Sequence, residues 1–450
     1  MPHRKAAPQV TLLAPAPRYF EPLRDRRDTL SRLRRLPRLS LLALEAATPP
    51  QWDVQIIDER VEAFEPDRIS SDIVGITVMT YMAPRAFEMA RALKKRGKTV
   101  ILGGYFPSLS PQLALQEPSV DAIVIGRAER SWPVLLQDFL AGRLQRQYSV
   151  PFGGEGFSLP QYNRALTGPD KGYNTWITQV QAGLGCKFSC RFCVIPDFHG
   201  QTVAMRSIDD LVEEVARAPT RRVLFVDDNL LNRPAWLHAL CDRLRPLGKE
   251  WVAQVSMDIA KQKGLIKKMA KSGCGWLNVG IESLHEGSLS AQEKWQNNTR
   301  NYLETLNRIR DEGISLSTGM VMGFPHEPRD VFDVTGEFLD RANVDITIFH
   351  IYTPYPGARD YARLLAEDRI LTRDLEMYDT YHVTVRPDAF APEEVATEIE
   401  RLQERFYQPH RVLQRAARGL AHGGPFDLIR TLATGVEGYF NLKQGLPLHP

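Results

Sequence analysis

Three of the five cysteines in this 450-residue chain, Cys186, Cys190 and Cys193, lie close together with the spacing C-x3-C-x2-C. Thiolates gathered in this way are typical ligands of zinc or of an iron–sulfur cluster. A tetrahedral zinc site needs a fourth ligand, and the nearest downstream candidate, His199, falls at no common zinc-finger spacing. A four-iron cluster suits three thiolates better, because it leaves one iron open to a small molecule.

The segment Gly185–Cys193, with the aromatic Phe192 just before the last cysteine, resembles the cluster motif of the radical S-adenosylmethionine (SAM) superfamily. The resemblance implies a [4Fe-4S] cluster whose open iron chelates the amino and carboxylate groups of SAM. It also implies that the reduced cluster cleaves SAM to a 5′-deoxyadenosyl radical, and that Phe192 packs near the adenine.

The composition describes a soluble globular protein of two or three domains, with 43% apolar residues, 25% charged residues and a formal charge of +3. This charge demands neither nucleic acid nor an anionic membrane as a partner. No apolar run approaches the ~20 residues of a transmembrane segment, and the start of the chain lacks the apolar core of a signal peptide. Few cysteines outside the motif indicate a reducing compartment, so we expect a cytoplasmic protein whose Cys241 and Cys274 are core residues.

The first third of the chain alternates between strand-like and helix-like segments, which predicts an α/β fold with a doubly wound, Rossmann-like parallel sheet over residues 1–145. The expected strands are 10–13, 54–58, 73–78, 99–102 and 122–125, and the expected helices are 84–95 and 132–139. Ligands of such sheets bind at the carboxyl ends of the strands, here near Asp58, 77–82, 103–108 and 126–129. No G-x-G-x-x-G follows a strand, which argues against a dinucleotide.

This segment resembles the cobalamin-binding domain of cobalamin-dependent radical SAM enzymes, through the pieces 37–44, 57–59, 103–107 and 120–129. The resemblance implies that cobalamin is bound by the strand-end residues Asp58, Thr77, Gly103, Gly104, Tyr105, Gly126 and Glu129. Some features depart from the family. The D-x-H-x-x-G signature is missing, Phe106 stands where many relatives carry histidine, and Arg127-Ala128 replaces an acidic-glycine pair. Either the cobalt lacks a lower ligand from the protein, or the domain has lost the cofactor and keeps a structural or substrate role.

Residues 146–173 are rich in glycine and proline and are expected to be a linker. From 174 to 370 the strand–helix alternation returns in six repeats, which indicates the partial (β/α)6 barrel of the radical SAM fold. Residues 371–450 are expected to be a helical C-terminal region, with a long helix over 392–416.

Polar and glycine residues at the ends of the barrel strands match positions that contact SAM in the family. The resemblance implies SAM contacts from Gln254, Ser256, Glu282, Ser283, Gly319 and Met322. Glu282 has the alternative role of a structural ion-pair partner. The run Asp227-Asp228-Asn229 either serves SAM or substrate, or caps the turn that follows it.

Three further side chains are candidates for substrate binding or proton donation. His350 and Tyr352 lie at the end of the last barrel strand, before the turn Thr353-Pro354-Tyr355-Pro356-Gly357, and His199 lies six residues past the last cysteine. A structural role is the alternative for each of them.

The resemblance identifies the chain as a cobalamin-dependent radical SAM enzyme, and a methyltransferase acting on an unactivated carbon is the expected activity. Its expected partners are a small-molecule or peptide substrate and a flavodoxin or ferredoxin that donates one electron. The alternative is a radical SAM cyclase, rearrangement or oxidation enzyme whose first domain has modified or lost cobalamin binding. A methylthiotransferase would need three more cluster cysteines, and none precedes Cys186. A cluster-bearing sensor without SAM cleavage is the non-enzymatic reading.

Overall fold

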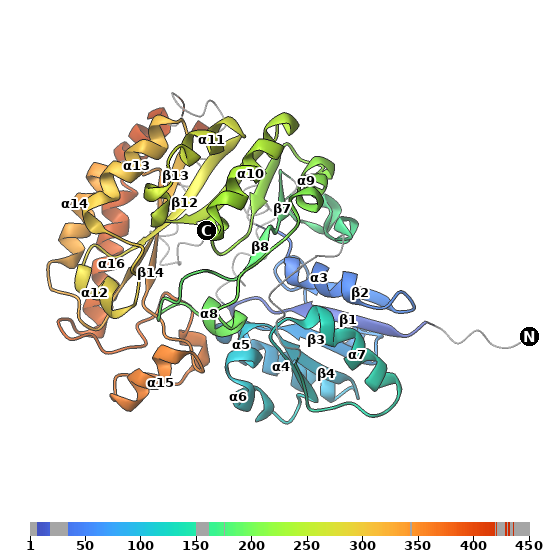
Figure 1. Ribbon diagram of the computed structural model, residues 1–450. Helices are drawn as coiled ribbons and strands as arrows, with labels where there is room; N and C mark the ends of the chain where they lie inside the picture. Colours follow the sequence, from blue (N-terminus) through green and yellow to red (C-terminus); the bar gives the residue numbers. More distant parts are fainter. Residues whose placement is uncertain are drawn as a thin grey trace, which may run out of the picture.

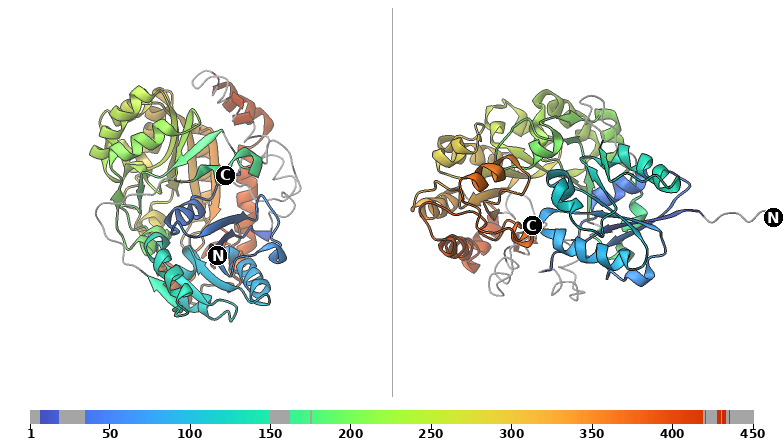
Figure 2. Two further views of the ribbon diagram at one scale, coloured as in Figure 1. Left: turned by 90° about the vertical axis from the view of Figure 1, so that its right-hand side faces the viewer. Right: turned by 90° about the horizontal axis from the view of Figure 1, so that it is seen from below.

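The structure is a computed structural model that describes residues 7–18, 35–149, 162–174, 176–342 and 344–418, together with 420, 428, 429, 431, 432 and 435. Two parallel sheets, each covered by helices, lie side by side (Figures 1 and 2). This arrangement confirms the predicted α/β class, with a doubly wound domain followed by a partial barrel.

The N-terminal sheet has six parallel strands in the order β2-β1-β3-β4-β5-β6, which is a doubly wound topology. The strands are β1 (Gln9–Ala14), β2 (Asp53–Asp58), β3 (Ile73–Thr77), β4 (Thr99–Gly103), β5 (Ala122–Ile125) and β6 (Gln147–Ser149). Helices α4 (Ala83–Lys94), α5 (Tyr105–Leu109) and α6 (Pro111–Leu115) cover one face, and α3 (Leu39–Ala47) and α7 (Ala128–Leu140) cover the other.

Apolar side chains that alternate along the strands fill both faces of this sheet. On β3, for example, Ile73 packs with Leu41 of α3 and Trp132 of α7, whereas Val74 packs with Met89 of α4. Burial on both faces is the reason these strands read as continuous apolar runs in the sequence.

The sixth strand, β6, corrects the predicted boundary of the linker, because it lies within residues 146–173. Only Tyr148 of its three residues is buried, so this edge strand has no apolar run to reveal it. The hydroxyl of Tyr148 donates a hydrogen bond to Asp138 Oδ2 at 3.1 Å, which ties the strand to α7. Much of the remaining linker, 150–161, lies outside the described residues.

The second sheet also has six parallel strands, in the order β14-β13-β12-β11-β10-β7. They are β7 (Ile177–Val180), β10 (Arg222–Phe225), β11 (Glu250–Ser256), β12 (Cys274–Glu282), β13 (Ser315–Met322) and β14 (Ile346–Ile351). Since β7 and β14 stand at opposite edges, the sheet curls without closing, as six repeats predicted.

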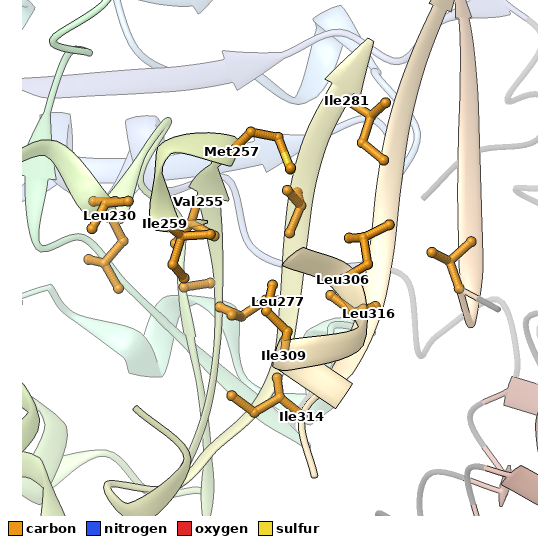
Figure 3. Packing of buried hydrophobic residues seen from close by; sticks show 14 of the residues in the cluster. Leu230, Val255, Met257, Ile259, Leu277, Ile281, Leu306, Ile309, Ile314 and Leu316 are labelled. Carbon is orange, nitrogen blue, oxygen red and sulfur yellow. The ribbon is translucent and has the colours of Figure 1, made fainter. Parts of the chain in front are cut away.

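Helices between these strands cover the outside of the partial barrel and share one core with it, part of which Figure 3 shows. They are α9 (Ile208–Arg217), α10 (Pro234–Leu244), α11 (Leu265–Lys271), α13 (Tyr302–Asp311) and α14 (Val331–Ala342), whereas the short helix α12 (Glu286–Ala291) after β12 is not part of this core. Cys241 is part of this core, 1% exposed, and Cys274 is part of it at 5%, as expected from the sequence.

Helix α16 (Pro392–Phe406) packs Val395, Ile399 and Leu402 into the barrel core, so the first part of the predicted C-terminal region belongs to the barrel. The helix ends at Phe406, and helical geometry resumes over 409–418 after a break. At the break, the Tyr407 hydroxyl donates to the Thr347 carbonyl at 3.0 Å. Most of the chain beyond 418 lies outside the described residues.

The described residues contain no helix with both the length and the apolar character needed to cross a membrane.

Candidate active site

The cluster loop, which we define as Gly185–Cys193, follows the short strand β8 (Gly183–Leu184) and precedes α8 (Ile195–His199). Gly185 has φ +73°, and a Cβ there would lie 2.0 Å from the Thr202 carbonyl oxygen, so only glycine fits this turn. Asn232 holds both sides of the turn: its Nδ2 donates to the Gly185 carbonyl at 2.8 Å and its Oδ1 accepts from the Lys187 amide at 3.0 Å.

The buried carboxyl of Asp227 anchors the chain before the loop by accepting hydrogen bonds from the amides of Ala182, at 2.9 Å, and Gly183. Burial raises the pKa of Asp227 to about 7. Asn229 caps the turn after β10, since its Oδ1 accepts from the Leu231 amide at 3.1 Å. Asp227 and Asn229 therefore shape the loop and the turn after β10, and Asp228 faces the cavities described below.

Cys186, Cys190 and Cys193 line one cavity of about 350 Å³ at the mouth of the partial barrel, which we call the barrel cavity. Amide groups point at two of the sulfurs: Asn229 Nδ2 lies 3.8 Å from Cys186 Sγ, and Gln296 Nε2 lies 3.5 Å from Cys190 Sγ. Burial, together with the charge of the neighbouring Cys190, raises the pKa of Cys193 to about 12. One buried and two partly buried thiols that line one cavity are suited to a cationic group that compensates their charge.

Across the described residues, no group of three His, Cys, Asp or Glu side chains converges closely enough to hold a single metal ion. A four-iron cluster places less demand on convergence, because its thiolates bind different irons. Three thiols that line one cavity match the three cysteine ligands that the cluster motif predicts.

Glu282 and Lys294 form an ion pair in the barrel cavity, and both side chains are largely buried. Burial lowers the pKa of Lys294, but the carboxylate of Glu282 and the thiolates of Cys190 and Cys193 outweigh it and hold the pKa above its usual value. Lys294 Nζ also lies 5.4 Å from the centre of the Phe192 ring. The ion pair thus places one carboxylate and one ammonium group next to the Phe192 ring of the cluster loop.

A chain of hydrogen bonds across neighbouring strands orients the polar floor of the barrel cavity. Ser317 Oγ donates to Asn278 Oδ1 at 3.0 Å, Asn278 Nδ2 donates to Gln254 Oε1 at 3.1 Å, and Gln254 Nε2 donates to the Asp228 carbonyl at 3.1 Å. Beside this chain, Ser256 Oγ accepts from Asn229 Nδ2 at 3.0 Å, which links Ser256 to the residue behind Cys186.

Of the six strand-end residues predicted to contact SAM, four line the barrel cavity: Gln254, Ser256, Glu282 and Gly319. Ser283 does not line this cavity, which corrects the prediction that it contacts SAM. It is fully buried, and its hydroxyl donates to Glu327 Oε1 at 3.3 Å. Met322 is likewise a fully buried core residue.

His350 and Tyr352 line the barrel cavity, but each is engaged by a neighbour. Nδ1 of His350 lies 3.0 Å from Thr380 Oγ1, and burial lowers the pKa of this imidazole. The Tyr352 hydroxyl donates a hydrogen bond to the buried carboxylate of Asp360, and this bond fixes the position of the tyrosine side chain. His199 lies outside the barrel cavity and lines a second one.

The second cavity, of about 340 Å³, lies at the carboxyl ends of the N-terminal strands, and we call it the sheet cavity. Six residues predicted to bind cobalamin line it: Thr77, Gly103, Gly104, Tyr105, Gly126 and Glu129. Glycines keep its rim free of side chains, since a Cβ at Gly126 would meet nothing within 4 Å and one at Gly103 would meet only Val124 at 4.0 Å. Bare backbone at strand ends suits a large flat ligand.

Asp58 does not line the sheet cavity, which corrects the prediction that it contacts the ligand there. Its carboxylate is buried, pairs with Arg60 at 2.5 Å and lies 3.8 Å from Arg38. Burial alone would raise the pKa of Asp58, but hydrogen bonds and charge from Arg60 hold it below its usual value. Asp58 therefore positions Arg38, which does line the sheet cavity.

Asp228 lines both cavities and marks the place where they meet. Tyr105, at the start of α5, packs against Phe198 of α8 with ring centres 4.5 Å apart and the rings tilted by 39°, so the two domains touch beside this junction. Burial raises the pKa of the Tyr105 hydroxyl, and the nearby charges of Asp228 and Cys193 raise it further. A ligand in the sheet cavity would thus face one in the barrel cavity across Asp228.

Comparison with known families gives the same division of the chain. Residues 180–339 match the Radical SAM superfamily and residues 31–136 match the B12 binding domain. The chain is a radical SAM protein with a B12-binding domain.

Relatives of this radical SAM protein span most of its length. It is 26% identical over 387 residues to bacteriochlorophyllide d C-12(1)-methyltransferase of Chlorobaculum tepidum, covering 84% of each chain. It is 23% identical over 410 residues to hopanoid C-2 methylase of Rhodopseudomonas palustris, covering 86% of this chain and 74% of the relative. The structure of the methyltransferase TsrM from Kitasatospora setae, with cobalamin and a [4Fe-4S] cluster bound, superposes with a TM-score of 0.69 at 14% identity, over 98% of this chain and 99% of that one.

The family supplies three groups, a [4Fe-4S] cluster, SAM and cobalamin, and the residues present fit each of them. The three thiols with amide neighbours suit the cluster, and the polar floor with the Glu282–Lys294 pair suits the charged and hydroxyl groups of SAM. The glycine rim of the sheet cavity suits the corrin ring.

Sequence reasoning missed Lys294 and Gln296, which reach the cysteines from the segment after α12, and Asn278, which orients Gln254. Neither Lys294 nor Gln296 lies at a strand end or in a motif. Asn278 lies within β12, four residues before Glu282, and the alternation of that strand was the one signal that could have found it.

Proposed function

We propose that this chain is a cobalamin-dependent radical SAM methyltransferase that acts on an unactivated carbon of a small molecule. The single observation that carries the proposal is that the barrel cavity and the sheet cavity meet at Asp228. A substrate carbon held at this junction has the SAM site in the barrel cavity on one side and the corrin site in the sheet cavity on the other side. The relatives named as methyltransferases support the same activity.

When bound, the cluster and SAM supply the hydrogen-abstracting radical, and cobalamin supplies the methyl group. The residues of this chain hold these groups and shape the space between them. Glu282 offers its carboxylate to an ammonium or to ribose hydroxyls, while Phe192 and Gly319 form walls for a flat base. Tyr105 and Phe198 pack together and give the junction aromatic walls, and a water-poor site protects a radical from side reactions.

The junction is lined by aromatic side chains as well as by Asp228, which favours a substrate with an apolar ring or chain and one hydrogen-bond donor. Tyr105 and Phe198 line the sheet cavity, and Tyr355 lines the barrel cavity. The two relatives described above are named for a bacteriochlorophyllide and for hopanoids. We propose a mostly apolar small molecule as the substrate of this chain.

Each methylated product needs two electrons from outside, one to form the radical and one to make the corrinoid ready for a new methyl group, and we propose a flavodoxin or a ferredoxin as their source. The same requirement for a reduced cluster supports a reducing compartment, and we propose the cytoplasm.

The test starts with anaerobic reconstitution of the full chain with iron, sulfide and cobalamin. We expect iron–sulfide and corrinoid absorption together, and SAM cleavage to 5′-deoxyadenosine under dithionite. With SAM labelled in its methyl group, a methylated product should form with one 5′-deoxyadenosine and one S-adenosylhomocysteine each. Cleavage of SAM without corrinoid binding would instead support a cobalamin-free radical enzyme.

A variant separates the two cofactor sites. Gly103→Leu places a side chain in the sheet cavity at a strand end where the backbone is not strained, so corrinoid binding should weaken while the iron–sulfide absorption stays. Thr99→Leu at the other end of β4 is the matched control and should retain both. Equal corrinoid binding by both variants would contradict the assignment of the sheet cavity.

A further inference from the structure

The segment Gln292–Asn297, which we call the covering segment, closes over the outer side of the cluster loop. The Arg191 amide donates to the Gln292 carbonyl at 3.0 Å, and Arg191 Nε donates to Glu293 Oε1 at 2.8 Å. Gln296 Nε2 reaches Cys190 Sγ at 3.5 Å. The covering segment therefore touches the cysteines directly and forms the wall between Cys190 and the surface.

Side chains of the covering segment alternate between the inside and the outside. Lys294 and Gln296 are each 8% exposed and face the cluster loop, whereas Trp295 between them is 69% exposed. Isolated exposed tryptophans are uncommon on surfaces that have no partner, and tryptophan is enriched at the centres of protein interfaces. Trp295 thus stands on the surface one residue away from a side chain that contacts a cysteine.

Trp295 borders an open cavity of about 580 Å³ on the outside of the barrel, which we call the outer cavity. Apart from Lys294, whose ammonium group pairs with Glu282, its charged lining is Lys261, Arg300 and Arg308 against Glu286 and Glu304. The Arg300 side chain is 84% exposed, and it approaches Glu286 only at 4.0 Å. Lys261 is exposed, and so is Lys263 further along the same turn. The rim of the outer cavity is therefore basic.

Other basic residues next to the cluster loop are already neutralised by carboxylates. Lys187 pairs with Asp258 at 2.6 Å, and Arg359 pairs with Asp197 at 2.6 Å. Lys261 and Arg300, which line the outer cavity with Trp295, therefore offer the more available positive charge next to the covering segment.

We propose that the outer cavity and Trp295 form the docking surface for an acidic one-electron carrier protein, which passes its electron inward through the covering segment to the cluster. This inference rests on the proposed function and deepens it. Transient redox complexes bury little surface and are steered by complementary charge, which a small basic cavity with one exposed aromatic ring provides.

The kinetic test compares two reductants on the reconstituted full chain, with 5′-deoxyadenosine as the product measured. The double variant Lys261→Glu/Arg300→Glu should lower the rate with a reduced acidic flavodoxin about tenfold or more at low salt, because it reverses the steering charge. Its rate with dithionite should equal that of the unsubstituted protein. Lys95→Glu, on the exposed end of α4 in the other domain, is the matched control and should leave both rates unchanged.

Trp295→Ala changes no charge and gives a second variant if the double variant folds poorly. It should lower the flavodoxin-driven rate and leave the dithionite-driven rate intact. Unchanged flavodoxin-driven rates in both variants would overturn the proposal. An equal fall with both reductants would also overturn it, since the residues would then act on the cluster or on SAM.

A binding test does not depend on catalysis. A water-soluble carbodiimide joins carboxylates of the docked flavodoxin to lysine amines, and peptide mapping should find Lys261 or Lys263 cross-linked at low salt and released at high salt. Cross-links confined to lysines elsewhere would overturn the proposal. If the unsubstituted protein cross-links at these lysines but cleaves no SAM with dithionite, the proposed function fails and the docking surface stands.

Discussion

Ser110 and Pro356 join the two domains directly: Ser110 Oγ, at the turn between α5 and α6, donates a hydrogen bond to the Pro356 carbonyl at 2.7 Å. The next residue, Gly357, has φ +88°, and a Cβ there would lie 1.8 Å from the Leu109 carbonyl oxygen. The backbones of the two domains are therefore in contact at this point. The turn 353–357, which contains Pro356 and Gly357, also places Tyr355 in the lining of the barrel cavity. The contact between the domains therefore sets the distance across the junction of the two cavities.

Gly357→Ala should force the two domains apart, because the added methyl group overlaps the Leu109 carbonyl. We expect methyl transfer to fall about a hundredfold, the effect of a displacement of about 1 Å between reacting groups. SAM cleavage under dithionite should continue, so the ratio of 5′-deoxyadenosine to methylated product should rise. Gly313→Ala is the control: its φ is +80° but its Cβ would meet nothing within 4 Å, so it should cost only about 1–2 kcal/mol of backbone strain. Equal ratios in the two variants would refute the spacing role.

Replacing any one of Cys186, Cys190 and Cys193 by serine should abolish the iron–sulfide absorption and SAM cleavage, because a hard hydroxyl replaces a soft thiolate. Cys241→Ser is the matched control, since Cys241 is buried between helices away from the barrel cavity and should leave the spectrum unchanged. Absorbance and iron content of anaerobically reconstituted protein measure this. A cysteine-loop variant that kept full iron would contradict the assignment.

Lys294→Met should lower the free energy of unfolding by about 3–5 kcal/mol, because it leaves the Glu282 carboxylate buried without its cation. Adding Glu282→Gln should recover much of this stability, whereas SAM binding should remain weak because the charged floor is lost. Lys268→Met breaks the exposed pair with Asp242 and should cost about 0–1 kcal/mol. Denaturant unfolding and equilibrium binding of SAM separate these effects. Equal costs for Lys268→Met and Lys294→Met would show that burial of the pair is unimportant.

The sequence predicted best those parts of the site that depend on short-range signals. The cluster loop follows from its cysteine spacing and from Gly185, and both sheets follow from strands that read as buried apolar runs. Gln254, Glu282 and Gly319 line the barrel cavity as expected, because the carboxyl ends of parallel strands meet at one edge of a sheet.

A local irregularity in one strand and contacts between distant parts of the chain explain what the sequence did not predict. At the end of β12 the pairing register shifts between Gly280 and Glu282, and Glu282 has φ +66°, so the alternation breaks and Ser283 turns to Glu327 instead of the cavity. Gln296 reaches Cys190 from a loop 106 positions away in the chain, where no periodic pattern marks it. Such contacts arise only once the fold brings the segments together.

Replacing the Asp228 carboxyl group is expected to change stability and methyl transfer in opposite directions. Burial raises the pKa of Asp228 to about 6 from 3.8, so the folded protein binds a proton in this range that the unfolded chain releases. The contribution of Asp228 to stability therefore falls as the pH rises from about 4 to about 6, and the cost is complete above pH 6.

Asp228→Asn should remove this cost, so the variant should be at least as stable as the unsubstituted protein at pH 7.5, and any gain should vanish near pH 4. Methyl transfer should nevertheless fall about 10- to 100-fold, the value of one hydrogen bond to a charged group, because the carboxylate at the junction is lost. Asp67→Asn is a control of opposite sign. The Arg96 partner lowers the pKa of Asp67, so the stability it contributes is present at neutral pH and is lost as the pH falls. Thermal unfolding at pH 4 and pH 7.5, with methylated product measured at pH 7.5, tests both effects. Lower stability together with unchanged methylation would make Asp228 a structural residue and remove it from the junction's chemistry.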